Sequence, residues 1–355
     1  MAEKVLMKGN EAIAEAAIRA GCRHYFGYPI TPQTEIAAYM AKRMPKIGGV
    51  FLQAESEISA INMVYGVAGT GKRVMTSSSS PGVSLKQEGI SYIAGADLPA
   101  LIVNVQRGGP GLGGIQPSQS DYFQATKGGG HGDYHLIVLT PASVQEMADL
   151  TSLAFELAEK YRMPAMLLAD GTMGQMMEPV ELPEASDCAG TEKPWAVTGT
   201  GGKRKHNIIN SLYLVPEVLE QTNLERFARY RLIEETEARY ESFLMEDAEY
   251  CVVAFGIAAR VARSAVTAAR KEGIKVGLIR PITVWPFPKK PLAEAAEQVK
   301  GFLSVELSMG QMIEDVKLAT GCKKPVALCS RVGGMIPSTE QVLQSIRDME
   351  GGCKE

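Results

Sequence analysis

The sequence of 355 residues is poor in the residues that build metal and redox centres. Its six cysteines include no C-x-x-C pair, and the two nearest to each other, Cys322 and Cys329, are seven positions apart; there are four histidines. Zinc and iron–sulfur sites use clustered thiolate or imidazole ligands. The sequence therefore argues against a metal or cluster carried by this chain alone, and its isolated thiols indicate a cytoplasmic protein.

Long apolar runs and a large excess of one charge are also missing. No apolar stretch reaches the roughly 18 residues that a spanning helix needs, and the N-terminal MAEKVLMKGNEAIAEA lacks the apolar core of a secretory signal. The net charge is −3 and the pI is about 6.0. These values predict no nucleic-acid partner and no membrane partner.

What remains is the composition of a globular protein, with 45% hydrophobic and 22% charged residues, at a length that suits two domains. Along residues 1–185, apolar segments that predict strands (24–30, 74–77, 99–105, 136–141, 164–170) alternate with segments that predict helices (9–20, 84–96, 143–162). This alternation predicts an α/β fold with a doubly wound parallel sheet.

The remaining chain predicts a connection and a second, smaller unit. Residues 186–248 are rich in proline, glycine and charge, and indicate a linker followed by a helical hairpin or a connecting helix. Residues 249–355 repeat the strand–helix alternation, with a proline-rich turn at 282–291, and predict a small four-stranded α/β unit.

The stretch 53–82 carries the sharpest candidate for chemistry. Glu55 and Glu57 open an apolar helical run, and the next strand ends in four serines and a Pro-Gly pair. A carboxylate in a cleft can have a raised pKa and exchange a proton with a ligand nitrogen. The alternative is that both acids are solvated in the first helical turn, where the helix dipole favours them. Because they are two residues apart, at most one should enter a cleft.

Two further candidates follow strands. Thr31 is expected to cap a helix that has Pro32 in its first position, and such a helix N-terminus can also hold an anion. Arg107 follows a buried strand, where it could hold a carboxylate or simply lie on the surface. The loop 108–114, GGPGLGG, has no helix directly after it, so it predicts a mobile active-site loop and no dinucleotide fingerprint.

Nucleophile and metal chemistry have little support in the remaining motifs. The serines at 77–80 lie in no G-x-S-x-G elbow and have no supporting histidine pattern, which disfavours a serine nucleophile. His131 and His135 could reach the same cleft, but an H-x-x-x-H pair in a glycine-rich loop is weak evidence for a metal.

Several segments together resemble the α subunit of the 2-oxoacid:ferredoxin oxidoreductases. They are GNEAIAEAAIRAGCRHYFGYPITPQTE, QAESEISAINMVYGVAGTGKRVMTSSSSPGVSL, NVQRGGPGLGG, LTPASVQEM, IRPITVWPFP and SVELSMGQM. They agree in order and spacing and cover nearly the whole chain outside 185–245. The resemblance is strongest to the branched-chain (2-oxoisovalerate) type, and the 2-oxoglutarate type stays open.

The resemblance implies a division into a thiamine-diphosphate pyrimidine-binding domain (1–185), a linker with a charged helical segment (186–248) and a transketolase-C-terminal-like domain (249–355). In the family, a glutamate in an E-x-x-A-x-x-x-x-x-G pattern contacts N1′ of the cofactor. Glu57, Ala60 and Gly66 fit this spacing, whereas Glu55 does not.

The other site residues are carried over from the matching motifs in the same way. The pyrimidine pocket is expected to include Ser78, Ser79, Pro81 and Gly82. The substrate carboxylate is expected to lie beside Thr31, Arg107 and Gly108.

The family reaction is the oxidative decarboxylation of a 2-oxoacid with CoA, giving acyl-CoA, CO2 and reduced ferredoxin. This sequence lacks the GDG…N segment that binds Mg²⁺ and diphosphate; Asp170-Gly171 follows Ala169 and has no suitable asparagine after it. The resemblance therefore implies partners: a β subunit with Mg²⁺, diphosphate and a [4Fe–4S] cluster, a γ subunit, a ferredoxin-like δ subunit with further clusters, and an external ferredoxin. Alone, the chain is expected to be inactive.

Two other interpretations compete. The first is the pyrimidine-side subunit of a lipoamide-dependent 2-oxoacid dehydrogenase, which the YPITP and QRGGPG segments fit poorly. The second is a non-catalytic α/β binding or scaffold protein in which Glu57 is merely solvated.

Overall fold

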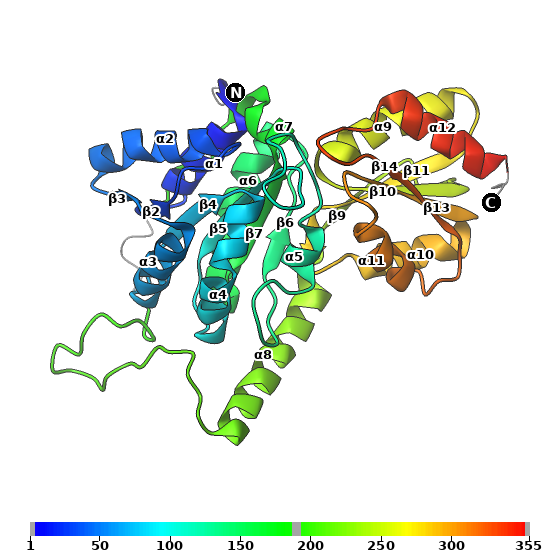
Figure 1. Ribbon diagram of the computed structural model, residues 1–355. Coiled ribbons are helices and arrows are strands. Elements are labelled where there is room, and N and C mark those ends of the chain that lie inside the picture. Colours follow the sequence, from blue (N-terminus) through cyan, green and yellow to red (C-terminus); the bar gives the residue numbers. More distant parts are fainter. Residues whose placement is uncertain (1–3, 187–192, 352–355) are drawn as a thin grey trace.

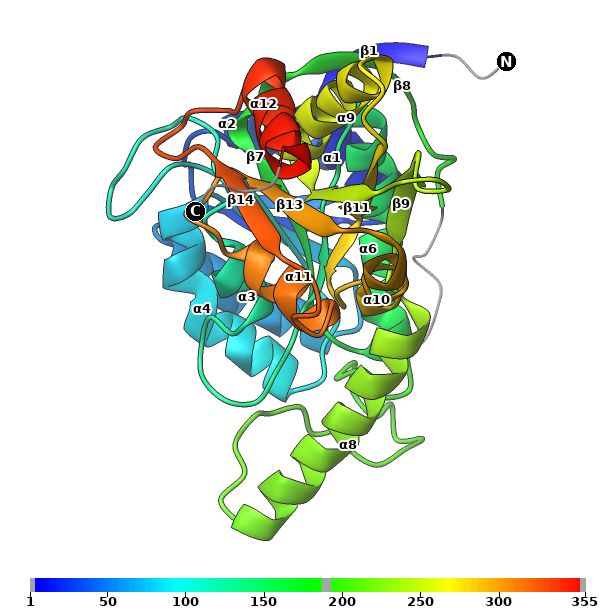
Figure 2. The same cartoon turned by 90° about the vertical axis from the view of Figure 1, so that its right-hand side faces the viewer.

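A computed structural model describes residues 4–186 and 193–351, so that part of the predicted linker, 187–192, lies outside the described residues. The chain forms two α/β units side by side, and a long helix projects beyond both of them (Figures 1 and 2). The predicted α/β class is confirmed, because each unit is built on a sheet whose central strands are parallel.

The first unit contains a seven-stranded sheet in the order β12-β6-β7-β5-β4-β2-β3. Only β12 runs antiparallel to its neighbour. Every residue of β4, β5, β6 and β7 is buried, as expected for strands covered on both faces. The strands are β2 (His24–Gly27), β3 (Val50–Gln53), β4 (Val74–Ser78), β5 (Leu101–Gln106), β6 (Ile137–Leu139), β7 (Ala165–Asp170) and β12 (Thr283–Trp285).

Helices cover both faces of this sheet. Helix α1 (Gly9–Arg19) packs against α2 (Thr34–Arg43) and α6 (Val144–Tyr161), while α3 (Glu57–Gly69) packs against α4 (Ser80–Gly95). The strand order, with right-handed crossovers, places α2 and α6 on one face and α3 and α4 on the other. Shorter elements are η1 (Met44–Ile47), α5 (Tyr122–Thr126), α7 (Gly171–Gln175) and a two-stranded sheet of β1 (Lys4–Lys8) and β8 (Met177–Glu181).

Two predicted helix starts are wrong. Helix α2 begins after Gln33, so Thr31 does not cap it. Residues from other elements hold the turn before α2: Asn10 donates to the Pro32 carbonyl (2.9 Å), and the amide oxygen of the buried Gln33 accepts from the Ser77 hydroxyl (2.5 Å). Helix α4 begins at Ser80, four residues before the predicted position, because proline is tolerated in a first turn where its missing N–H is not needed.

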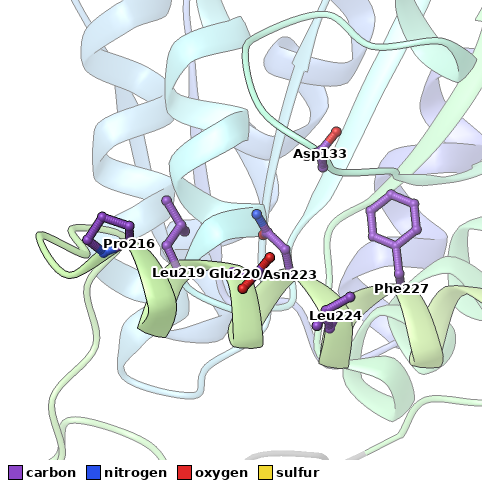
Figure 3. A pocket seen from close by; sticks show the side chains of 7 residues that line it. All are labelled: Asp133, Pro216, Leu219, Glu220, Asn223, Leu224 and Phe227. Carbon is purple, nitrogen blue, oxygen red and sulfur yellow. The ribbon is translucent and has the colours of Figure 1, made fainter.

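The connection between the units is a single helix, α8 (Pro216–Thr236), preceded by an irregular segment from 193. This agrees with a connecting helix and not with a hairpin. Its inner side and the loop of Asp133 enclose a largely apolar pocket of about 590 Å³ (Figure 3). The lining residues are Asp133, Pro216, Leu219, Glu220, Asn223, Leu224 and Phe227.

The second unit has a five-stranded sheet in the order β14-β13-β10-β11-β9, one strand more than predicted. The additional strand, β9 (Tyr240–Phe243), lies within the predicted linker and pairs antiparallel with β11. The others are β10 (Tyr250–Ala254), β11 (Val276–Pro281), β13 (Gly301–Glu306) and β14 (Val326–Ser330). Helices α9 (Gly256–Lys271) and α12 (Thr339–Glu350) cover one face, and α10 (Lys289–Gln298) and α11 (Met312–Ala319) cover the other (Figure 1).

The two units share a sheet edge and a core. The segment predicted as a proline-rich turn contains β12, which pairs with β6 of the first unit. The start of this short Thr-Val-Trp strand is held from two sides. The N–H groups of Ile282 and Thr283 donate to the Arg239 carbonyl, and the Arg239 N–H donates to the Thr283 hydroxyl. The N–H and the hydroxyl of Thr140 both donate to the Ile282 carbonyl. A single cluster of buried apolar residues extends through both units.

The amide of Gln119 joins the units at the ends of two strands. It is 1% exposed. Its Nε2 donates to the carbonyl of Phe255 (2.8 Å), and its Oε1 accepts from the N–H of Leu307 (3.0 Å). Its own backbone N–H donates to the Leu307 carbonyl (3.0 Å). One side chain from the first unit therefore satisfies buried backbone groups after β10 and after β13.

Replacing Gln119 by alanine should leave two buried backbone groups without partners. We expect a loss of about 2–4 kcal/mol in the free energy of unfolding, measured by urea denaturation. Gln344→Ala is the matched control, because Gln344 is exposed on α12 and its loss should cost no more than about 0.5 kcal/mol. Equal losses in the two variants would contradict the role of Gln119.

Candidate functional site

A cleft of about 900 Å³ lies where the carboxyl ends of β4 and β5 face those of β13 and β14. In doubly wound proteins, ligands bind at the carboxyl ends of parallel strands. The lining residues are Ser80, Pro81, Ser84, Leu85, Arg107, Gly108, Gly109, Pro110, Gly111, Ser118, Ser120, Asp121, Leu307, Ser308, Met309, Gln311, Val332 and Gly333. The cleft therefore combines the predicted residues after β5 with a second wall that was not predicted.

Glu57 is not among the residues that line this cleft; it stands at the first position of α3, which packs against α4. The side chain of Ser56 caps the helix by accepting from the N–H of Ser59 (3.2 Å). Glu57 is 6% exposed, whereas Glu55 lies before the helix and is exposed to solvent. Of the two acids, Glu57 is therefore the buried one, and its entry into a ligand site stays a prediction.

Gly82 is a glycine because Glu57 and Ser78 approach its backbone. A Cβ atom at position 82 would lie 2.6 Å from Oε1 of Glu57 and nearer still to Oγ of Ser78. Both distances are shorter than real Cβ contacts, so a side chain at position 82 would have to displace Glu57 and Ser78. The first turn of α4 thus forms a close contact with the carboxylate, beside Pro81, which lines the cleft.

Ser78 and Ser79 provide unused hydrogen-bonding capacity at the same place. Both residues are fully buried, and neither hydroxyl has a hydrogen-bond partner within the described residues. Buried hydroxyl groups are normally satisfied, because an unmet one costs about 1–3 kcal/mol. Neither residue is in the lining of the cleft, so these two donors lie behind its wall.

Arg107 reaches the cleft from the end of β5 and is 9% exposed. Its Nη1 donates to the carbonyl of Thr31 (3.0 Å) and its Nη2 to that of Leu112 (3.1 Å), while its buried Nε has no partner. The predicted cation therefore lies in the cleft with one N–H still available. Gly108, also predicted, is part of the lining beside it.

Thr31 meets Arg107 only through its backbone. The residue is exposed, and it lines a separate pocket of about 480 Å³ with Ile115 and Thr172. Its side chain is not part of the lining of the cleft that contains Arg107. Thr31 and Arg107 are thus in contact through the Thr31 carbonyl, and their common role beside a substrate carboxylate stays a prediction.

Asp121 and Ser80 were not singled out from the sequence. The Ser80 hydroxyl donates to the Asp121 carboxylate (2.6 Å) and accepts from the backbone N–H of Arg107 (3.0 Å), while Asn104 also donates to Asp121 (2.9 Å). Burial raises the pKa of Asp121, and these hydrogen bonds oppose that rise. Of the residues that line the cleft, Arg107 is the only cation and Asp121 the only carboxylate. No local pattern marks Asp121, because its partners come from α4 and β5.

Lys86 is another missed residue, fully buried in α4. Its Nζ donates to Oγ1 of Thr76 (2.7 Å) and to the carbonyl of Ser77 (3.0 Å). Burial lowers its pKa to about 7, and the charge of Glu57 opposes this shift. A sequence signal did exist, since Lys86 stands between Val83 and Ile90 at the spacing of the buried helix face.

The second wall of the cleft is held by Glu306, which is fully buried at the end of β13. Its carboxylate accepts from the backbone N–H groups of Gln311, Met312 and Ile313, each at 2.9 Å. It also accepts from the hydroxyls of Ser304 and Ser308. The carboxylate thereby organises the start of α11 and the loop that faces Arg107.

The two histidines considered for this cleft lie elsewhere. His135 stacks on Trp285 with ring centroids 4.6 Å apart, and burial lowers its pKa. His131 approaches Ser91 on α4. Neither lines the cleft. Residues 4–186 and 193–351 contain no group of three His, Cys, Asp or Glu side chains placed to hold a metal, and no helix among them has the length and apolarity to span a membrane.

The sequence matches two family models and several known proteins. Residues 15–241 match the family of pyruvate flavodoxin/ferredoxin oxidoreductases, thiamine-diphosphate-binding, and residues 248–342 match pyruvate:ferredoxin oxidoreductase core domain II. The chain is 53% identical over 346 residues to the ketoisovalerate oxidoreductase subunit VorB of Methanothermobacter marburgensis, covering 98% of each chain. It is 37% identical over 381 residues to the 2-oxoglutarate synthase subunit KorA of the same organism, covering 99% of this chain and 100% of that one.

A solved structure is similar as well. The 2-oxoglutarate:ferredoxin oxidoreductase from Magnetococcus marinus, with 2-oxoglutarate, coenzyme A and succinyl-CoA bound, superposes with a TM-score of 0.85 at 28% identity. The match covers 98% of this chain and 65% of that chain. Two family models that between them cover most of the sequence, together with relatives of 37–53% identity along its length, show that the chain belongs to the 2-oxoacid:ferredoxin oxidoreductase family, as its motifs had predicted.

Proposed function

We propose that this chain is the subunit of a thiamine-diphosphate-dependent 2-oxoacid:ferredoxin oxidoreductase that holds the pyrimidine end of the cofactor, and that its substrate is a branched-chain 2-oxoacid such as 2-oxoisovalerate. The buried carboxylate of Glu57, close to Gly82 in the first turn of α4, is the main observation behind this proposal. The alternative of a scaffold protein predicts a solvated Glu57, and this prediction disagrees with the burial of Glu57.

The residues present fit the pyrimidine end of thiamine diphosphate. Glu57 offers a carboxylate to a ring nitrogen, Ser78 and Ser79 offer two unsatisfied hydroxyls, and Pro81 and Gly82 lie beside them in the first turn of α4. When bound, the cofactor supplies a carbon nucleophile for the 2-oxo group. Glu57 holds the proton shared with N1′, in a place from which water is largely excluded.

Arg107 binds the carboxylate of the 2-oxoacid, with Gly108 beside it. Its unpartnered Nε is free to donate, and its two other donors can leave the backbone carbonyls of Thr31 and Leu112. Thr31 contributes to this step by positioning Arg107 through its carbonyl. A planar guanidinium suits this task because it pairs with a carboxylate through two parallel hydrogen bonds.

The cleft favours an apolar substrate side chain. Once Arg107 pairs with the carboxylate next to the 2-oxo group, the lining holds no second cation for another carboxylate. Asp121 would repel one. The apolar lining residues Leu85, Leu307, Met309 and Val332 suit a branched aliphatic chain. The higher identity to the ketoisovalerate subunit than to the 2-oxoglutarate subunit supports the same choice.

The reaction also needs groups that we assign to partner subunits. A β subunit would supply Mg²⁺, the diphosphate site and a [4Fe–4S] cluster, while a γ subunit and a ferredoxin-like δ subunit would complete the complex. CoA would accept the acyl group and an external ferredoxin the electrons, in the cytoplasm.

A viologen-reduction assay of the purified complex, with CoA and a panel of 2-oxoacids, tests the substrate directly. We expect 2-oxoisovalerate and its branched homologues to give a kcat/KM at least about tenfold higher than 2-oxoglutarate, the effect of roughly 1.4 kcal/mol of differential binding. A preference for 2-oxoglutarate would contradict the proposed branched-chain substrate and would make this chain a 2-oxoglutarate-type subunit. No reaction with any 2-oxoacid would refute the enzyme itself.

Glu57→Gln in the assembled complex should lower turnover about 10²–10⁴-fold, because the amide cannot share the proton at N1′. Glu55→Gln is the matched control, since it changes the same charge two residues away on the exposed side. Turnover near normal in Glu57→Gln would remove Glu57 from the mechanism.

Arg107→Ala should lower kcat/KM for every 2-oxoacid about 10–100-fold, because hydrogen bonds to a carboxylate contribute about 1.5–3 kcal/mol. Binding of thiamine diphosphate, measured by calorimetry on the same complex, should stay within about threefold of the wild type if Arg107 contacts only the substrate. Unchanged kinetics for all substrates would end the proposed role.

A further inference from the structure

Exposed aliphatic side chains are concentrated in the segment 208–224, which includes the start of α8. Ile208 and Leu214 are each 83% exposed. Residues 216–225, the N-terminal half of α8, include no buried residue. A helix in water depends on the packing of an apolar face, and contiguous exposed apolar surface marks interaction sites. The other exposed aliphatic residues are Leu212, Val215, Val218, Leu219 and Leu224. This segment therefore has the composition of a docking surface.

The same surface carries charges of both signs that have no partner. The three residues at 203–205, Lys-Arg-Lys, come just before it and are exposed. Three exposed acids, Glu217, Glu220 and Glu225, lie on α8. None of these six charges forms an ion pair within the described residues, whereas Arg226 and Glu234 of the same helix do. One end of the surface is thus basic and the other acidic.

The acidic end coincides with the pocket of about 590 Å³ beside α8 (Figure 3). Its apolar lining includes Leu219, Leu224 and Phe227. Glu220 on the helix and Asp133 on the facing loop add two carboxylates, and no basic side chain belongs to the lining. Such a pocket suits an aliphatic side chain that is accompanied by cations, because charges across an interface are complementary.

We propose that this pocket binds the segment 203–208 of a second copy of the chain, so that two copies form a symmetric dimer. Ile208 of each copy enters the pocket of the other, and the basic residues before it face Glu220 and Asp133. Each copy carries both the segment and the pocket, so a two-fold axis makes the same contact twice. Within one chain, Ile208 is not in the lining of its own pocket.

The basic segment is already held in shape by its own chain. The side-chain amide of Asn207 donates to the carbonyls of Pro194 (2.5 Å) and Ala196 (2.9 Å). Nη2 of Arg204 donates to the same Ala196 carbonyl (3.0 Å). Because these bonds are present before association, less conformational entropy is lost when Ile208 docks.

This dimer leaves the cleft accessible. Helix α4 begins at Ser80, which lines the cleft, and ends at Gly95, whose carbonyl accepts from Arg226 of α8. The helix has 16 residues and is therefore about 24 Å long. The docking surface and the cleft thus lie at opposite ends of α4, and one subunit can cover the cleft while a second copy covers α8.

The experiment is sedimentation equilibrium of the purified full-length chain at low ionic strength, where charges are weakly screened. The wild type should form a dimer. Two variants reverse one end each: Glu217→Lys with Glu220→Lys, and Lys203→Glu with Lys205→Glu. Each variant alone should raise the dissociation constant of the dimer at least about tenfold, because like charges then face each other in both halves of the interface.

Mixing the two variants identifies the occupant. In a mixed dimer each reversed end faces an end of opposite charge, so the dissociation constant should return to within about threefold of the wild type. The matched control is Lys42→Glu with Lys46→Glu, which reverses two exposed lysines elsewhere on the first unit and should leave the dimer unchanged.

A monomeric wild type would overturn the proposal, and so would a mixture of the variants that fails to recover association. Native mass spectrometry of the assembled complex provides a further check. If the reversed variants lose a different subunit there and keep two copies of this chain together, the surface belongs to that subunit and the second copy is refuted as its occupant.

Discussion

The geometry of the cleft depends on the hydrogen bonds by which Gln119 joins the two units. The amide satisfies a carbonyl after β10 and an N–H after β13, so the carboxyl ends of two separate sheets are held facing each other. The loop 307–311 is also tied to the first unit at Gln311, whose amide donates to the Ser120 carbonyl (2.8 Å) and accepts from the N–H of Phe123 (2.8 Å). Glu306 supports the same loop from behind by accepting three backbone N–H groups. Buried polar groups that are fully satisfied in this way define one arrangement of the two units.

The region around Glu57 differs from the Gln119 region, because several of its buried polar groups have no hydrogen-bond partner. Ser78 and Ser79 have buried hydroxyls without partners, and the carboxylate of Glu57 presses on a glycine. Such groups reduce the stability of the chain alone, and their cost is recovered when a ligand binds. Under the proposed function, the first unit would supply one half of a binding site and another subunit the other half.

Most of the fold could be predicted from the sequence, because its strands and helices are marked by local patterns. The helices α1, α3 and α6 and the strands β5 and β7 lie where the apolar periodicity placed them. The errors fall where distant residues decide the local structure. Asn10 and Ser77 hold the turn that was predicted to begin a helix at Thr31, and pairing with β6 turns the proline-rich segment into β12. The edge strand β9 depends in the same way on β11.

Spacing along the chain was enough to identify the family, to favour Glu57 over Glu55 through the family pattern and to place Arg107 after β5. How these residues meet depends on the packing of the whole chain. It brought the Thr31 carbonyl to Arg107 and left the Thr31 side chain in another pocket, and it placed Asp121, Gln119 and Glu306 around the cleft. Contacts between residues far apart in sequence are set by the packing of sheets and helices, so no local sequence motif predicts them.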